Sequence, residues 1–324
     1  MKYFVLLFFS FLWFLGCSKQ ATQWLGDADI LPDDYRYGDL YRFSNLPKFR
    51  VLAEKCPAPQ PQFKLPIQLI LFGDSFTEEG RIEANHFVAS HFTRKFVAEN
   101  GYVSLEKNTK KVLIIETVER HFRERFADKY QHVKVNLAPP NEEKTVLQTL
   151  LDWKVPYSTE RHTAVLFSSD FMLSIKELKA VFTKNIFHRI DENVTLSPNE
   201  NEIVYSLDTK EGINSSFDEV SNEDVDKYVN NINSTYEFYK QQGFDEVYLS
   251  IIPNKTSIVA TDLGTYNRLI ERIQEHKSLK MPFIDMYKPL KKGGASLFDK
   301  GDSHWNCNGK QLWIDKVNNL LKNV

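Results

Sequence analysis

Apolar positions along this chain form short runs that alternate with helix-like stripes. Three runs are apolar almost throughout, as in strands buried on both faces, and they cover residues 67–73, 111–119 and 247–253. Shorter runs predict further strands over residues 163–169 and 281–286. Apolar residues spaced three or four apart predict helices over residues 88–96, 175–187, 221–243, 263–273 and 313–320.

This alternation determines the fold class that we expect. Strands separated by helices of this length favour right-handed crossovers and a mostly parallel sheet. We therefore predict an α/β protein, with a doubly wound, mostly parallel sheet covered by helices on both faces in a flavodoxin-like three-layer sandwich. One helix start is well marked, because Ser221 and Asp224 form a capping box and Gly243 ends the stripe that follows.

The first 17 residues have the pattern of a targeting segment. Lys2 precedes the apolar run "YFVLLFFSFLWFLG", which ends at Cys17 and is short for a membrane span of roughly 20 apolar residues. Gly16 before Cys17 resembles the bacterial lipoprotein signal, in which the cysteine is lipidated and becomes the new N-terminus. Phe14 departs from the aliphatic residue usual there, so a plain secretory signal and an uncleaved anchor stay open. All three alternatives export the protein, and the lipoprotein signal, which we expect, anchors it by lipid in the bacterial cell envelope, on the periplasmic or outer face.

Residues 18–65 show no sustained period and are rich in Tyr, Asp and Pro, which predicts a tether and an N-terminal wrap. The main domain is expected over residues 66–324. Within it, residues 126–163 and 188–220 are charged and weakly periodic. These two segments are either insertions that shape a cleft or surface loops.

Charge and cysteine content narrow the classes of partner. The chain has 41 basic and 43 acidic residues and no long basic stretch with interleaved aromatics, which argues against a nucleic-acid partner. If Cys17 carries lipid, Cys56 and Cys307 are left to form a disulfide in an oxidising compartment, or to remain two unpaired thiols. No spacing of His, Cys and carboxylate residues matches a metal-ligand motif, so we predict no metal and no cofactor.

Candidate chemistry begins at "LILFGDSF", residues 69–76, where an apolar strand ends in a polar turn that contains Ser75. Doubly wound sheets bind their ligands at the carboxyl ends of the strands. Ser75 is therefore a candidate nucleophile, with its backbone N–H as a candidate oxyanion donor. Gly-Asp-Ser is also an ordinary turn composition, so a simple strand exit is the alternative.

A serine hydroxyl needs a general base, and His304 is the best candidate among the eight histidines. It lies in the polar loop "FDKGDSHWNCNGK" before the last helix, two residues after Asp302. The spacing lets the Asp302 carboxylate orient the ring while Nε2 faces outward. Trp305 is an aromatic residue in this polar loop and is expected to line a substrate cleft. His121 is a minor candidate for the base.

These residues carry a resemblance to a known superfamily. "GDSF" at 73–76 resembles the first block of the SGNH (GDSL-type) hydrolases, and "DSHWN" at 302–306 resembles the Asp-x-His-Trp motif of the alginate O-acetyltransferase branch. "IIPNK" at 251–255 and "KVLIIETVER" at 111–120 are similar to two further motifs of that branch, and some helices are similar to those of the Asp-His-His-Trp family.

The resemblance implies O-acyl transfer, most simply of acetyl, to a cell-surface or secreted polysaccharide through an acyl-serine. It also implies a membrane-bound protein as acyl donor. Arg120 and Asn254 are candidate oxyanion donors, with a salt-bridged strand end and a turn cap as their alternatives, and Lys255 is a candidate substrate-binding residue. The order of the motifs along the chain is that of the SGNH esterases, so hydrolysis of a carbohydrate acetyl ester stays open. A glycan-binding lipoprotein with an inactive triad and a purely structural lipoprotein are the alternatives without catalysis.

Overall fold

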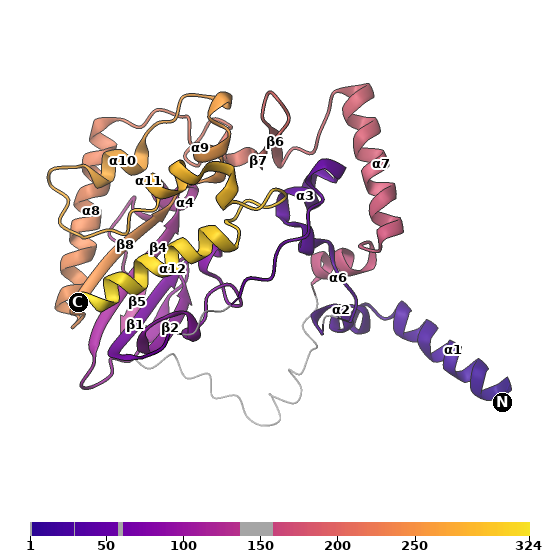
Figure 1. The fold of residues 1–324 in the computed structure, drawn as a ribbon, viewed down its shortest axis with the longest axis horizontal. Helices are drawn as coiled ribbons and strands as arrows, with labels where there is room; N and C mark the ends of the chain where they lie inside the picture. Colours follow the sequence, from indigo (N-terminus) through magenta and orange to yellow (C-terminus); the bar gives the residue numbers. More distant parts are fainter. Residues whose placement is uncertain (1, 29, 58–60, 137–157) are drawn as a thin grey trace. The chain divides into compact units, whose positions relative to one another are not determined.

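The computed structural model describes residues 2–28, 30–57, 61–136 and 158–324, and the chain divides into two compact units (Figure 1). The first unit comprises Met1–Ala53 with Pro140–Asp191, and the second comprises Glu54–Pro139 with Glu192–Val324. The unit boundary therefore lies at residue 54, so that residues 54–65 of the expected tether belong to the second unit.

A four-stranded parallel sheet forms the centre of the second unit. Its strand order is β2-β1-β4-β8, and the strands are β1 (Leu65–Gly73), β2 (Ala89–Phe96), β4 (Lys110–Val118) and β8 (Glu246–Ile252). The registers pair Leu69 with Val112 and Ile114 with Tyr248. Two small sheets accompany it: a parallel pair β3 (Gly101–Val103) and β5 (Val133–Val135), and an antiparallel pair β6 (Val194–Leu196) and β7 (Ile203–Tyr205).

Helices cover both faces of this sheet. Alternate strand residues point to opposite sides, so each strand contributes to two cores. Ile70 and Phe72 of β1 belong to one core, which they share with the long helix α8 (Asn222–Gln241) and with the short helices α4 (Glu119–Arg125) and α10 (Leu269–Gln274). Leu69 and Leu71 belong to the other core, which is shared with α11 and α12. Helix α12 crosses in front of the strands in Figure 1. The predicted α/β sandwich with a mostly parallel sheet is confirmed. The helices of this unit are α4 (Glu119–Arg125), α8 (Asn222–Gln241), α9 (Lys255–Val259), α10 (Leu269–Gln274), α11 (Tyr287–Gly293) and α12 (Cys307–Lys322).

Several predicted elements agree with the structure. The three doubly buried runs are β1, β4 and β8, and the last predicted helix is α12. Helix α8 starts as expected, because the Ser221 hydroxyl accepts the Asp224 N–H at 3.0 Å. The helix predicted over 263–273 is only the shorter α10, preceded by a 3₁₀ turn at Thr261–Leu263.

Three predicted elements are wrong. The stripe over residues 88–96 is not a helix but β2, an edge strand for which a spacing of four is equally compatible with alternation. Residues 163–169 do not form a strand, because the Ser158 hydroxyl caps helix α6 (Thr159–Leu166). The strand expected over 281–286 is reduced to one bridge between Leu249 and Phe283.

The first unit is helical. Its helices are α1 (Lys2–Cys17), α2 (Lys19–Asp27), α3 (Asp39–Ser44), α6 and α7 (Asp170–Phe187), with 3₁₀ turns at Asp34–Tyr37 and Pro47–Phe49. Among the described residues no single helix is long and apolar enough to span a membrane, although α1 and α2 together, bent by 85°, satisfy that test of length and composition. Much of the proposed insertion at 126–163 lies outside the described residues. Most of the other, 188–220, belongs to the second unit and contains β6 and β7.

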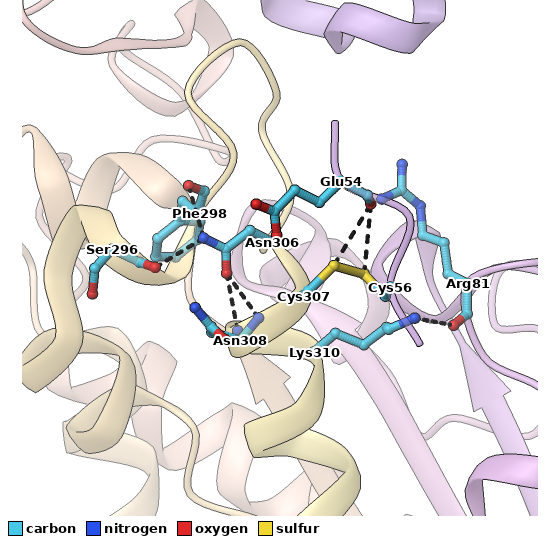
Figure 2. The surroundings of a disulfide bond; sticks show 10 residues. Glu54, Cys56, Arg81, Ser296, Phe298, Asn306, Cys307, Asn308 and Lys310 are labelled. Atoms are coloured by element: carbon cyan, nitrogen blue, oxygen red, sulfur yellow. Dashed lines mark hydrogen bonds between the residues drawn. A yellow bond between two sulfur atoms is a disulfide. The ribbon is translucent and has the colours of Figure 1, made fainter. Parts of the chain in front are cut away.

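A disulfide links Cys56, near the start of the second unit, to Cys307, the first residue of α12 (Figure 2). The two Cα atoms are 5.1 Å apart, and 251 positions separate the residues in the sequence. The bridge therefore joins the start of this unit to the helix that follows the His304 loop. Cys17 is a free, exposed cysteine.

We expect Cys56→Ser with Cys307→Ser to lower the free energy of unfolding by about 2–5 kcal/mol, because the crosslink closes a long loop in the unfolded chain. Urea titration of the double variant, the oxidised protein and the reduced protein measures this change. Cys17→Ser is the matched control and leaves the unfolding curve unchanged. Equal stability of the double variant and the oxidised protein would contradict the expected role of the bridge.

Candidate active site

The turn after β1 presents Ser75 at the carboxyl end of a central strand. Asp74 starts a 3₁₀ turn at Ser75–Thr77 and accepts the Ser75 N–H on Oδ1 at 2.9 Å. A side chain at Gly73 would place its Cβ 2.0 Å from the Thr77 hydroxyl, so the close approach of turn and strand requires glycine there. Ser75 itself is half-buried and keeps its hydroxyl available.

The structure brings the three predicted triad side chains together. The Ser75 Oγ lies 2.9 Å from Nε2 of His304, and Nδ1 of the same ring lies 2.5 Å from Oδ1 of Asp302. The His304 N–H also donates to that carboxylate oxygen, at 2.8 Å. With the ring proton on Nδ1, His304 donates to Asp302 and accepts from the serine hydroxyl, as a general base must.

Asp302 has the electrostatic character that this arrangement requires. Burial by itself would raise the pKa of the Asp302 carboxyl, but attraction to His304 and the hydrogen bonds from it hold that pKa well below its usual range. Asp302 is therefore a carboxylate at neutral pH. It stabilises an imidazolium when His304 takes a proton.

Lys255 positions the loop that carries Asp302 and His304. Its ammonium is buried and donates to the backbone carbonyls of Asp299 (2.7 Å), Lys300 (3.1 Å) and Asp302 (3.0 Å). The expectation that Lys255 binds substrate is therefore wrong in this structure, because its donors point into the protein. Lys255 follows β8, so the ammonium connects the end of the sheet to the base and its partner.

Asn254 lies in a buried network and not at an open donor position. Its Oδ1 accepts the backbone N–H of Arg120 at 3.1 Å, and its Nδ2 donates to the Ser216 hydroxyl at 2.9 Å. The Asn254 N–H donates to the Glu119 carboxylate at 2.9 Å. The residue thus fastens the end of β8 to the start of α4 and to the segment around residue 216.

Arg120 also has a structural environment. Its Nε lies 3.3 Å from Oδ1 of the buried Asp208, and its guanidinium lies over the Tyr205 ring at 5.0 Å. This matches the salt-bridged alternative from the sequence. Because the Ser75 N–H is engaged by Asp74, all three groups expected to bind an oxyanion already have partners in this structure.

Trp305 does not line a cleft, which corrects the sequence prediction. It is 2% exposed, and its ring packs edge-on against Phe76 with centroids 5.0 Å apart. Phe76 in turn lies 4.7 Å from the His304 ring. Trp305 therefore belongs to the apolar layer behind the base, and its indole N–H has no hydrogen-bond partner among the described residues.

A buried acidic network behind Ser75 was missed by the sequence analysis. Glu116 Oε2 accepts the Asp74 N–H and the Thr77 hydroxyl, both at 2.7 Å, while Arg125 donates to Asp74 Oδ2 at 2.5 Å. Burial and the Asp74 charge raise the pKa of Glu116 to about 8. The glutamate inside the apolar run "VLIIETV" is the sequence feature that could have revealed this network, because a charged residue is rarely buried without a partner.

A cavity of about 470 Å³ opens beside Asp74. Phe96 and Val97, at the end of β2, line one side, and His121 with Arg125 of α4 line another. Burial lowers the pKa of His121. His121, the minor candidate for the base, therefore lies in the cavity wall, while His304 holds the contact with Ser75.

Among the described residues of the second unit, taken by itself, no three His, Cys, Asp or Glu side chains lie close enough together to hold a metal ion. Comparisons of the chain with protein-family models, curated proteins and solved structures found no significant match. The functional interpretation therefore depends on the residues themselves and on their geometry.

We expect Lys255→Met to lower the rate of Ser75 acylation by about 10²-fold with little change in KM, because the His304 loop loses its anchor. Stopped-flow measurement with a chromogenic acetyl ester separates the two constants. Lys292→Met, at an exposed position of α11, is the matched control. An unchanged rate in a folded Lys255→Met protein would show that the loop holds its position without the ammonium.

Glu116→Gln should change how stability depends on pH. The pKa of Glu116 is raised above its unfolded value, so its contribution is fully present below pH about 4 and is lost as pH rises through about 8. The amide cannot ionise, so we expect the variant to lose less unfolding free energy than the wild type between these values. Urea titrations across this range measure the effect, with the exposed Glu223→Gln as control. Parallel profiles for wild type and Glu116→Gln would show that this carboxyl does not titrate differently on folding.

Proposed function

We propose that this protein carries out O-acyl chemistry through an acyl-Ser75 intermediate. One observation carries the proposal: the chain of contacts from the Ser75 hydroxyl through His304 to the Asp302 carboxylate, at 2.9 and 2.5 Å. A serine, an imidazole and an ionised carboxylate in this order form the arrangement that activates serine for acyl transfer.

The reaction follows from these three side chains. The Ser75 Oγ attacks the carbonyl carbon of an ester while His304 Nε2 takes the hydroxyl proton. The resulting imidazolium is stabilised by Asp302, and it returns the proton to the leaving oxygen as the ester bond breaks. An acceptor hydroxyl then gives its proton to His304 and attacks the acyl carbon, and His304 returns a proton to Ser75 Oγ as the acyl–serine bond breaks.

The nature of the acceptor determines the class of enzyme. We infer that the acyl group is acetyl and that a hydroxyl of a cell-surface or secreted polysaccharide accepts it, since three of the four sequence motifs resemble those of the alginate O-acetyltransferase branch. In this proposal Cys17 carries a lipid anchor at the cell envelope, and a membrane-bound protein supplies the acyl group.

Hydrolysis is the second candidate, and a specific observation favours it. Trp305, which was expected to provide an aromatic platform for a sugar, is buried behind His304. Without that platform, water competes more effectively for the acyl-serine. A carbohydrate acetylesterase would use the same three side chains.

Intact-mass spectrometry after incubation with a chromogenic acetyl ester tests the nucleophile. We expect an acetyl adduct on the wild type and on the control Ser90→Ala, and none on Ser75→Ala. Asp302→Asn should slow adduct formation by about 10⁴-fold, because the ring loses its orienting carboxylate. Equal adduct on Ser75→Ala would overturn the proposal. No adduct on any protein, with glycan binding intact, would favour a binding protein with an inactive triad.

Candidate oligosaccharides added to the acetylated protein then separate the two classes. Acetylated sugar as the product supports transfer. Faster release of acetate without acetylated sugar supports the esterase.

A further inference from the structure

Helix α7 turns its apolar face outward. The sequence predicts a stripe of Ile175, Leu178 and Phe182, which would normally face a core. In the structure Leu178 is 72% exposed and Phe182 57% exposed, and Phe171 at the start of the helix is 71% exposed. With Ile186 these side chains form the outer face of α7, defined as Phe171, Ile175, Leu178, Phe182 and Ile186.

The opposite side of α7 is held inward by polar contacts. Lys176 Nζ lies 3.1 Å from Oδ2 of Asp34, whose side chain is only 3% exposed. Glu177 accepts a hydrogen bond from the Tyr41 hydroxyl at 2.9 Å, and Leu173 is fully buried on the same side. Turning the apolar face inward would break these contacts, leave Asp34 with Arg42 as its ion-pair partner and expose Leu173, so the contacts stabilise the observed orientation of the helix.

The outer face has the composition of a membrane-binding surface. Large apolar side chains follow one another along a helix of 18 residues, which is more than scattered exposed residues explain. The two acidic residues of α7 lie elsewhere, because Glu177 points inward and Asp170, at the first position, pairs with Arg36 and Arg50. The exposed Lys179 beside this face suits anionic headgroups, since a lysine stem lies along apolar surface while its charge reaches water.

The first unit also contains the apolar N-terminal helix α1. Helix α1 has no charged residue after Lys2, and Tyr3 through Trp13 are exposed along it. Helix α2 packs on α6, with Arg161 donating to Asp27 at 3.1 Å and Ser158 donating to Gln23 at 2.7 Å. Three residues join α6 to α7. The N-terminal segment and the outer face are thus parts of one compact unit.

We propose that the outer face of α7 lies in the membrane interface as an amphipathic helix parallel to the bilayer, in addition to any N-terminal anchor. Helices of this kind bury one apolar face roughly 5–10 Å deep, at the boundary between headgroups and acyl chains. Lipid then covers the outer face of α7 without a protein partner, whether the chain keeps α1 or begins at a lipidated Cys17. This placement is independent of the chemistry proposed at Ser75.

The test uses the full chain on vesicles of phosphatidylethanolamine and phosphatidylglycerol. A nitroxide spin label is attached at Leu178→Cys and, as the matched control, at Glu223→Cys on the exposed start of α8. The spectrum of the chain without an introduced cysteine is subtracted, which removes any label on Cys17. Power saturation then measures collision of each label with oxygen, which concentrates in the bilayer, and with a nickel chelate, which stays in water.

We expect the Leu178 label to gain oxygen collisions and lose nickel collisions on the vesicles, while the Glu223 label keeps its nickel collisions. Nickel access at Leu178 equal to that at Glu223 would overturn the proposal. Shielding of Leu178 from both reagents would also overturn it, because that result identifies a protein cover, either a second copy or the other unit. A chain that does not sediment with the vesicles overturns it as well.

Discussion

The contact of one buried ammonium with three carbonyls supports the candidate site. Lys255 follows the end of β8, and its ammonium donates to the carbonyls of Asp299, Lys300 and Asp302, which fixes the backbone of this loop up to the charged Asp302. A buried charge is unfavourable unless polar groups surround it. Moving the loop away would leave the Lys255 ammonium buried without its three acceptors. The positions of Asp302 and His304 therefore derive from the sheet itself.

A second network supports the serine in the same way. Glu116, on β4, binds both ends of the turn that carries Ser75, and Arg125 holds the far oxygen of Asp74. The side chains of Glu116, Asp74 and Arg125 are occupied by hydrogen bonds within this network. Their effect is to restrict the Ser75 backbone, which lets a single hydrogen bond to His304 define the geometry of the site.

The sequence predicted those parts of the fold in which the local pattern of apolar residues is compatible with only one kind of element. The runs of β1, β4 and β8 are apolar almost throughout because both of their faces are covered, and Ser75 lies where such a sheet binds its ligands, at the end of a strand. β2 was missed because Val88, Phe92 and Phe96 fit a helical and an extended period equally well. The short spacing between Asp302 and His304 was sufficient to predict that these two side chains are in contact.

The remaining residues of the site were misjudged because a sequence does not show which way a side chain points. Trp305 and Lys255 lie beside functional residues in the chain, yet both point into the protein. Asn254 looked like a donor and is a link between three segments. Burial and partner choice depend on contacts between residues far apart in the sequence, 134 positions for Asn254 with Arg120 and 47 for Lys255 with Asp302, which a local motif does not contain.

The long separation of Ser75 and His304 in the sequence also determines the order in which the two side chains are synthesised. The hydroxyl is synthesised 229 residues before its base, and Cys307, which closes the disulfide with Cys56, comes later still. A serine without a base is a poor nucleophile. In the proposed reaction, a growing chain therefore carries an unactivated Ser75 until His304 has been added and the loop before α12 has folded against the turn after β1.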